Sequence, residues 1–223
     1  MTAFPSPNFG ERRGGARPEL IVLHYTAMPT CDEARARLCD PAAEVSAHWL
    51  ISQGGVAEAL VPEEMRAWHA GAGAWGAVTD VNSSSIGIEL ANTGDAPFPE
   101  RQMAALERLL AEVMGRWHIP PERVIAHSDM APGRKRDPGP RFDWRRLARG
   151  GLSVWPEAGG DPDAPLRRSL RAFGYPDALP EVLLGAFRLR FRPSASGAED
   201  AMDRALAADL SRRFPVDGGG GAS

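Results

Sequence analysis

The chain is poor in cysteine, has no excess of one charge and lacks a long apolar run. Its 223 residues include 2 Cys, and 26 Lys and Arg stand against 29 Asp and Glu, for a formal net charge of -3. So balanced a composition argues against nucleic acid as a partner. No apolar stretch approaches the ~20 residues that a membrane-spanning helix needs, so we expect no transmembrane segment.

The N-terminus lacks the marks of a secretory signal. It has no basic start and no apolar stretch, and it contains Pro5, Pro7 and Gly10. As the sequence stands we expect a cytoplasmic protein, and the periplasm or envelope stays open if a targeting segment is absent from this numbering. Cys31 and Cys39 are expected to be reduced thiols, because a disulfide between them would require export. No second Cys/His pair follows at zinc-finger spacing.

The apolar pattern predicts a mixed fold. Short apolar runs predict buried strands at residues 20–23, 86–90 and 124–126. Residues 46–51 and 56–61, on either side of a glycine turn, predict a hairpin. After Pro99, apolar side chains recur every three or four residues as far as Trp117, which predicts a helix facing the core. We therefore predict an α/β (α+β) fold with a central mixed β-sheet flanked by helices.

The composition changes after residue 156, and three short helical patterns follow a Gly/Pro/Asp-rich linker. They predict a small C-terminal three-helix domain, near the lower size limit for independent stability. The glycine-rich end of the chain predicts a disordered tail. The predicted divisions are an N-terminal extension (1–17), a catalytic domain (18–156), a linker (157–164), the three-helix domain (165–215) and the tail (216–223).

Residues with catalytic chemistry stand at or near the ends of the predicted strands. His24, Glu89 and His127 do so, and Asp137 follows in a long loop that can turn back. Side chains at neighbouring strand ends can converge at one sheet edge. Two imidazoles and one carboxylate are a common ligand set for catalytic zinc and leave a position for water. We therefore expect one Zn²⁺ per chain, held by the two histidines and Asp137.

Two further residues would complete a hydrolytic site. Glu89 lies in an apolar strand, where an unpartnered charge is costly, and a place beside the metal water would explain it. It is the candidate general base, and Lys135 is the candidate donor to the carbonyl oxygen. Taken singly, each residue also has a structural interpretation: core histidines, a turn at Asp137 before proline, and solvated charges at Glu89 and Lys135.

Six ordered motifs between residues 18 and 156 resemble one family. They are Val22-Leu23-His24-Tyr25-Thr26, Ser46-Ala47-His48-Trp49-Leu50-Ile51, Ala67-Trp68-His69-Ala70-Gly71, Ser85-Ile86-Gly87-Ile88-Glu89-Leu90, Ala126-His127-Ser128-Asp129 and Arg134-Lys135-Arg136-Asp137-Pro138-Gly139-Pro140. Together they resemble the zinc N-acetylmuramoyl-L-alanine amidases related to phage-lysozyme amidases and peptidoglycan recognition proteins. The resemblance implies cleavage of the bond between N-acetylmuramic acid and L-Ala in peptidoglycan or anhydro-muropeptides.

The resemblance assigns roles by position. It implies that His24, His127 and Asp137 are zinc ligands, that Glu89 is the catalytic glutamate and that Lys135 is the transition-state lysine. The phage-lysozyme branch has cysteine in place of Asp137, and a tyrosine just before the histidine matching His48. Here Asp137 and Ala47 stand at these places, which puts the chain with the branch that relies on the glutamate.

Five residues are candidates for substrate contact: His48, His69, Trp75, Asn82 and Arg134. The two histidines could line the groove or support the metal site, or could be core residues bonded to the backbone. Trp75 could pack against a sugar face or lie in the core, and Trp68 is expected in the core.

The C-terminal segment resembles the three-helix peptidoglycan-binding module that is often fused to these amidases. The motifs are Leu170-Arg171-Ala172-Phe173-Gly174-Tyr175, Ala186-Phe187-Arg188-Leu189-Arg190-Phe191-Arg192-Pro193 and Gly197-Ala198-Glu199-Asp200. Arg188 stands where the module usually has glutamine. The alternative is a helical unit that only braces the catalytic one.

Three functions compete at this stage. The leading one is a zinc amidase, expected as a monomer, acting on soluble muropeptides or on intact sacculus. The alternative is a recognition protein that holds peptidoglycan without cutting it, for which loss of a zinc ligand would be the mark. The third is a metallopeptidase, although the His-Glu-x-x-His motif is absent.

Overall fold

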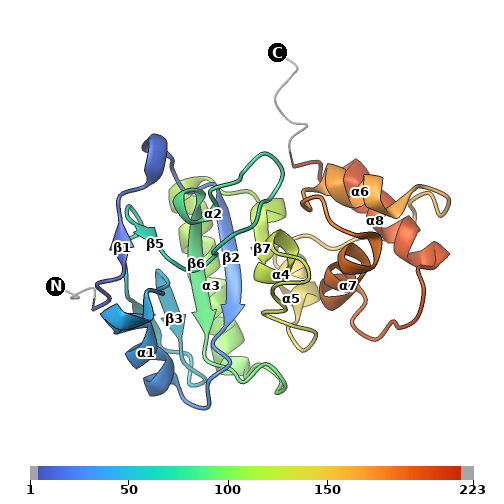
Figure 1. Cartoon of the computed structure of the whole chain (residues 1–223). Coiled ribbons are helices and arrows are strands. Elements are labelled where there is room, and N and C mark those ends of the chain that lie inside the picture. Colours follow the sequence, from blue (N-terminus) through green and yellow to red (C-terminus); the bar gives the residue numbers. More distant parts are fainter. Residues whose placement is uncertain (1–4, 217–223) are drawn as a thin grey trace.

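The computed structural model describes residues 5–216, and a mixed sheet lies at the centre of this part of the chain (Figure 1). The strand order is β4-β3-β6-β2-β7. Only β4 is antiparallel to its neighbour, and the other pairs are parallel. The strands are β2 (Leu20–Tyr25), β3 (Trp49–Ile51), β4 (Ala57–Ala59), β6 (Ser85–Leu90) and β7 (Val124–Ala126), and a separate antiparallel pair joins β1 (Phe9–Gly10) to β5 (Arg66–Ala67).

Helices cover the sheet and continue beyond its β7 edge, which confirms the predicted fold class (Figure 1). They are α1 (Cys31–Cys39), α2 (Val81–Ser84), α3 (Glu100–Trp117), α4 (His127–Met130), α5 (Trp144–Arg149), α6 (Leu166–Phe173), α7 (Pro180–Phe191) and α8 (Ala201–Arg213), with short 3-10 turns at Arg13–Gly15, Pro41–Ala43 and Pro121–Arg123. Within residues 5–216, no helix is long and apolar enough to span a bilayer. Cys31 and Cys39 are free thiols.

The central strand β2 divides the core into two halves. Successive side chains of a strand point to opposite faces. Ile21 and Leu23 accordingly belong to the apolar cluster that contains α3 and α5. Leu20 and Val22 belong to a second cluster on the other face. By the same alternation His24 follows Leu20 and Val22, so its ring lies on the face opposite α3.

The second cluster joins the sheet to the C-terminal helices. Besides Leu20 and Val22 it contains Phe173 of α6 and Phe187 of α7, all fully buried. The predicted linker is also closely packed, because a Cβ placed on Gly160 would lie 2.0 Å from a carbonyl oxygen of α8. The helices therefore share one core with the sheet. The domain limits stay a prediction.

The two ends of the described chain pack on the same body. Arg12, in the predicted N-terminal extension, donates through its guanidinium to the carbonyls of Ser83 and Glu63, both at 2.7 Å. Val216, the first residue of the predicted tail, is buried and accepts a hydrogen bond from Arg123 at 3.1 Å. The prediction of disorder is therefore wrong at Val216, and its remainder, 217–223, lies outside the described residues.

Candidate metal centre and active site

Strand register brings the first two candidate residues together. In the parallel pair β2–β6, His24 is the direct partner of Glu89. Paired residues of a parallel sheet project from the same face, so both side chains leave the sheet on the side opposite α3. On the other side of β2, Leu23 pairs with Ala126. His127, the next residue, therefore lies level with His24.

His127 directly follows the end of β7, as expected, and is the first residue of the short helix α4. His127 Nε2 lies 2.9 Å from the carbonyl oxygen of Ala70. A carbonyl can only accept, so Nε2 carries the proton and Nδ1 keeps its lone pair.

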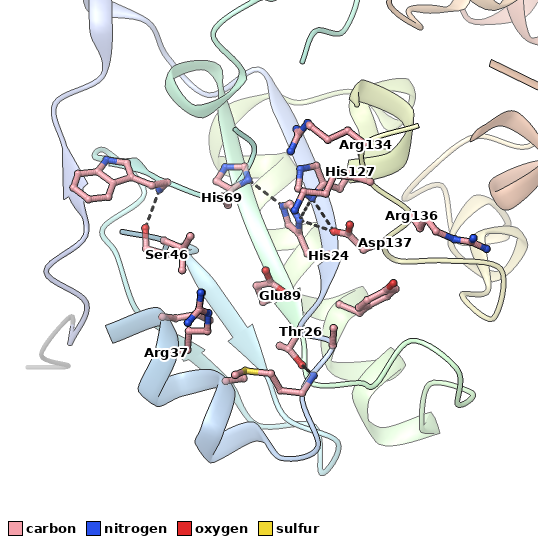
Figure 2. A pocket seen from close by; sticks show the side chains of 18 residues that line it. His24, Thr26, Arg37, Ser46, His69, Glu89, His127, Arg134, Arg136 and Asp137 are labelled. Carbon is pink, nitrogen blue, oxygen red and sulfur yellow. Dashed lines mark hydrogen bonds and ion pairs between the residues drawn. The ribbon is translucent and has the colours of Figure 1, made fainter. Parts of the chain in front are cut away.

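The three predicted metal ligands converge on one point (Figure 2). The Nδ1 atoms of His24 and His127 are 2.9 Å apart, and each lies 2.9 Å from Oδ2 of Asp137. All three residues are buried. Within residues 5–216 they are the one group of histidine, cysteine and acidic side chains whose ligand atoms gather closely enough to hold an ion.

A chain of hydrogen bonds fixes the protonation of His24. The hydroxyl of Ser85 donates to the carbonyl of Val81, so Ser85 Oγ accepts the proton of His69 Nε2 at 3.1 Å. His69 Nδ1 then has a lone pair and accepts from His24 Nε2 at 3.0 Å. His24 Nδ1, like His127 Nδ1, is therefore unprotonated.

The lone pairs of His24 Nδ1, His127 Nδ1 and Asp137 Oδ2 therefore face one another with no proton between them. This arrangement is repulsive unless a cation lies among the three atoms. Imidazole nitrogen and carboxylate oxygen are the ligand types that catalytic zinc sites use. Burial, and then the neighbouring His127, lower the pKa of His24 to about 4. His24 therefore stays neutral at pH 7, as metal binding requires, and the residues present fit a zinc ion.

Glu89 lies beside this group with one oxygen unsatisfied. Its Oε2 is buried and has no hydrogen-bond partner in the protein. Burial, followed by the charge of Asp137, raises the pKa of Glu89 to about 8, while Lys135 acts in the opposite direction. A carboxyl group with a raised pKa that faces a cavity has the properties of a general acid–base group.

The cavity in front of these residues holds about 430 Å³. Four cationic side chains line it, against two acidic ones, Glu89 and Asp137. Figure 2 shows Arg37 on the α1 side of Glu89 and Arg134 beyond His127. The cationic residues are Arg37, Arg134, Lys135 and Arg136. The cavity therefore favours an anionic ligand although the whole chain carries a net negative charge.

A glycine makes room for the His69 ring. Gly87 is in the middle of β6, and a Cβ added there would lie 2.4 Å from the Cγ of His69. Real Cβ atoms do not approach so closely, so any other residue would push the ring away from His24. The expectation that His69 supports the metal site agrees with this position, and His69 also lines the cavity.

Three of the residues predicted to contact substrate do not line the cavity, and His48 fits the alternative of a core histidine bonded to the backbone. His48 has no exposed surface: its Nδ1 accepts from Gly87 N at 2.9 Å, and its Nε2 donates to Met65 O at 3.0 Å. Asn82 is buried, and its side-chain oxygen accepts from the backbone amides of His69 and Ala70.

Trp75 is the third of these residues, and it fits the alternative of a core position. Its ring has no exposed surface and packs against Phe173 and Tyr175 with ring centroids 5.3 and 5.2 Å away. The turn at Gly174 closes over it. Trp68, expected in the core, instead lines the cavity.

The remaining candidates line the cavity, and sequence reasoning missed several others. Arg134 donates to the carbonyls of Ala70 and Ala72, so it also supports the loop beside His69. Lys135 lines the cavity wall. Ser85 and Arg37 were not predicted. A serine at the start of a strand gives no indication that it will hydrogen-bond to a histidine of the site, as Ser85 does to His69. Arg37, on the helix that follows the first motif, could have been proposed as a residue of the cavity wall.

Comparisons with known proteins agree with this geometry. A family model described as N-acetylmuramoyl-L-alanine amidase matches residues 14–140. The chain is 38% identical to the N-acetylmuramoyl-L-alanine amidase AmiD of Escherichia coli over 90% of this chain and 85% of that protein. It is 34% identical to the 1,6-anhydro-N-acetylmuramyl-L-alanine amidase AmpD of Enterobacter cloacae, over 64% of this chain and 86% of that one.

Solved structures extend the similarity to nearly the whole chain. One is E. coli AmiD in complex with anhydro-N-acetylmuramic acid-L-Ala-D-gamma-Glu-L-Lys, with a TM-score of 0.79 and 36% identity, covering 93% of this chain and 99% of that one. Another is AmpDh3 of Pseudomonas aeruginosa with an anhydromuramic pentapeptide, with a TM-score of 0.80 and 31% identity, covering 91% and 94%. The fold, the site and these similarities together show that the chain belongs to the N-acetylmuramoyl-L-alanine amidase family, as its motifs predict.

Proposed function

We propose that this chain hydrolyses the amide bond between N-acetylmuramic acid and L-Ala in muropeptides, with one zinc ion held by His24, His127 and Asp137. The observation that carries the proposal is the meeting of three unprotonated ligand atoms, each pair 2.9 Å apart. Zinc in such a site acidifies a bound water and polarises a carbonyl group. The other steps fall to residues of the chain.

Glu89 serves as the proton carrier. Its Oε2 has no partner in the protein, and a cation held by the neighbouring ligands would favour the ionised carboxylate, which can take a proton from the attacking water. The same carboxyl group then hands that proton to the nitrogen of L-Ala, so that the amine leaves neutral. The position of Glu89 beside His24 in the sheet supports this role, because it puts base and metal ligand on the same face.

Lys135 is proposed to stabilise the negative charge that grows on the scissile carbonyl oxygen. It lines the same cavity as Glu89, and its charge acts on Glu89 and His24. A positioned donor of this kind contributes about 3–4 kcal/mol to the transition state. The four cations of the cavity also complement the carboxylates of a stem peptide, which supports a muropeptide as substrate.

The decisive variant is Glu89→Gln. It should keep one zinc per chain and its fold, and lose about 100- to 10,000-fold in kcat, because glutamine cannot carry the proton. Zinc is measured by mass spectrometry of the metal, and turnover by chromatography of an anhydromuramyl tripeptide. Full activity in this variant would overturn the mechanism, and a metal-free protein that works at full rate in chelator would overturn the zinc proposal.

The same assay separates the competing functions. An amidase releases intact stem peptide beginning with L-Ala, whereas a metallopeptidase cuts within the stem. A recognition protein releases nothing at any enzyme concentration. Parallel assays on soluble anhydro-muropeptide and on purified sacculus show which form the enzyme prefers, a choice that the cavity alone leaves open.

A further inference from the structure

A buried carboxylate ties the metal site to the C-terminal helices. Asp129, two residues after His127 in α4, has no exposed surface. Its oxygens accept from Ala126 N at 2.9 Å, from the Tyr175 hydroxyl at 2.6 Å and from Arg190 at 2.5 Å. Arg190 lies on α7, and Tyr175 follows α6, so two of these three donors come from the C-terminal part of the chain.

Arg190 is equally buried, and it contacts both the first residue of β7 and the helix α4 that follows this strand. Besides Asp129 it contacts Val124 O at 3.2 Å and Ser153 Oγ at 3.0 Å. Its guanidinium stacks on the Trp144 ring, 4.2 Å from the centroid. A buried ion pair is often no more stabilising than apolar residues of similar volume. The positions that the Arg190–Asp129 pair imposes on its neighbours are therefore more informative than its contribution to stability.

The helix α4 in turn carries much of the active site. His127 is its first residue, and Ser128 N donates to the carbonyl of Asp137 at 3.1 Å. Lys135 N donates to the carbonyl of Ala131, directly after the helix, at 3.0 Å. A shift of α4 would therefore move two proposed metal ligands and the proposed oxyanion donor together.

The tyrosine stays a donor at any pH at which the protein works. Burial, followed by the charge of Asp129, raises the pKa of Tyr175 well above its usual value. A second contact reinforces the same link: a Cβ at Gly133, in the loop after α4, would lie 2.9 Å from Val182 of α7. The C-terminal helices thus press against the loop that leads to Lys135 and Asp137.

We propose that Arg190 and Tyr175 are positioning residues, which fix α4 through Asp129 and so hold His127 and Asp137 in the geometry that binds zinc. The C-terminal helices are then part of the metal centre's support, whether or not they also bind glycan. This inference rests on the proposed zinc site, and it assigns a role to residues that touch neither metal nor substrate.

The test compares zinc affinity in four variants of the full chain by competition with a chromophoric chelator. Changes to groups that support metal ligands typically weaken affinity 10- to 100-fold. We expect such a loss for Arg190→Met, and a loss of about 3- to 10-fold for Tyr175→Phe, which removes only the hydroxyl group. At saturating zinc, kcat should fall in both variants while KM changes less than two-fold.

Arg188→Met is the matched control. Arg188 is on the same helix and is also buried, but it pairs with Asp203 of α8 and the carbonyls of Gly197 and Ala198, away from α4. Its loss should lower the melting temperature and leave zinc affinity within two-fold of wild type. If Arg188→Met weakens zinc as much as Arg190→Met does, general destabilisation explains the effect and the proposal is overturned.

The remaining outcomes are also distinct. Should Arg190→Met fail to fold, Tyr175→Phe decides alone, and wild-type zinc affinity in that variant contradicts the inference. Wild-type protein that binds no zinc would instead contradict the proposed function. Arg190→Lys keeps the charge but loses the forked geometry, so a positioning role predicts only partial recovery of affinity relative to Arg190→Met.

Discussion

Two groups of buried histidines, His48 on one side and His24 with His127 on the other, differ in one respect. In His48 both ring nitrogens are satisfied by the protein, one by Gly87 N and the other by Met65 O. In His24 and His127 only Nε2 has a protein partner that explains its proton, and Nδ1 faces Asp137. Burial is the same in both groups. The comparison teaches that a lone pair without a donor, rather than burial, distinguishes the histidines proposed as metal ligands.

The largest effect on zinc binding is expected for His24→Ala. Because it removes a ligand itself, zinc affinity should fall by more than the about 100-fold typical of supporting groups, and amidase activity should be lost. Chelator competition and stem-peptide release measure the two effects. The control is His118→Asn: His118 is exposed and ends α3 with φ of 56°, a conformation that asparagine tolerates. Equal affinity in both variants would remove His24 from the site.

The second prediction concerns His69, which lies between the two groups. His69→Phe keeps the ring above Gly87 but removes the acceptor for His24 Nε2. Zinc affinity should fall about 10- to 100-fold, as for other groups that orient a ligand. Ser85→Ala, one step further along the hydrogen-bond chain, should cost less. A larger loss in Ser85→Ala than in His69→Phe would contradict the assigned proton positions.

His48→Phe should leave zinc binding unchanged within two-fold. It strands the buried Gly87 amide and Met65 carbonyl, which costs about 2–4 kcal/mol of stability. In a chain of this size that lowers the melting temperature by about 5–15 °C. Calorimetry in the presence and absence of zinc measures it. A loss of zinc affinity as large as that of His69→Phe would erase the difference between the two groups.

The smallest effect is a pH dependence in metal-free protein. The pKa of Glu89 is raised to about 8, so between its ordinary value of 4.5 and 8 the unfolded chain has released a proton that the folded one retains. Stability contributed by this group is therefore present below pH 4.5 and lost as the pH rises towards 8. The Glu89→Gln variant does not lose this stability, because glutamine does not titrate.

The melting temperature of metal-free Glu89→Gln, relative to wild type, should accordingly rise between pH 5 and pH 8. The comparison of two variants at each pH cancels the histidines, whose lowered pKa values act in the opposite direction. A constant difference across this range would mean that Glu89 is not buried in the protonated form.

The sequence predicted which side chains converge better than it predicted the residues around them. Strand ends are local features, and the register of β2 with its neighbours puts His24, Glu89 and His127 at one level. The sequence left the place of Trp75 open, and favoured the core for Trp68, because exposure depends on partners far along the chain. Trp75 is covered by Phe173 and the Gly174 turn, about 100 positions later.

The link between α4 and α7 escaped prediction for the same reason. Asp129 and Arg190 are 61 positions apart, and the motifs that contain them give no sign that the two side chains pair. The sequence of α7 did contain one indication. Arg188 and Arg190 alternate with apolar residues, so the helix cannot bury its apolar side chains without burying these two arginines as well. Charges at such places indicate buried partners, although the sequence does not name them.

Gly87 defines how far this site can be altered. Because Gly87 has no side chain, the edge of the His69 ring fits against its backbone. The position of that ring in turn orients His24, the first of the proposed metal ligands. A redesign that changes only the proposed metal ligands would leave the orientation imposed by His69 in place. The residue at position 87 of β6 would have to be varied together with those ligands.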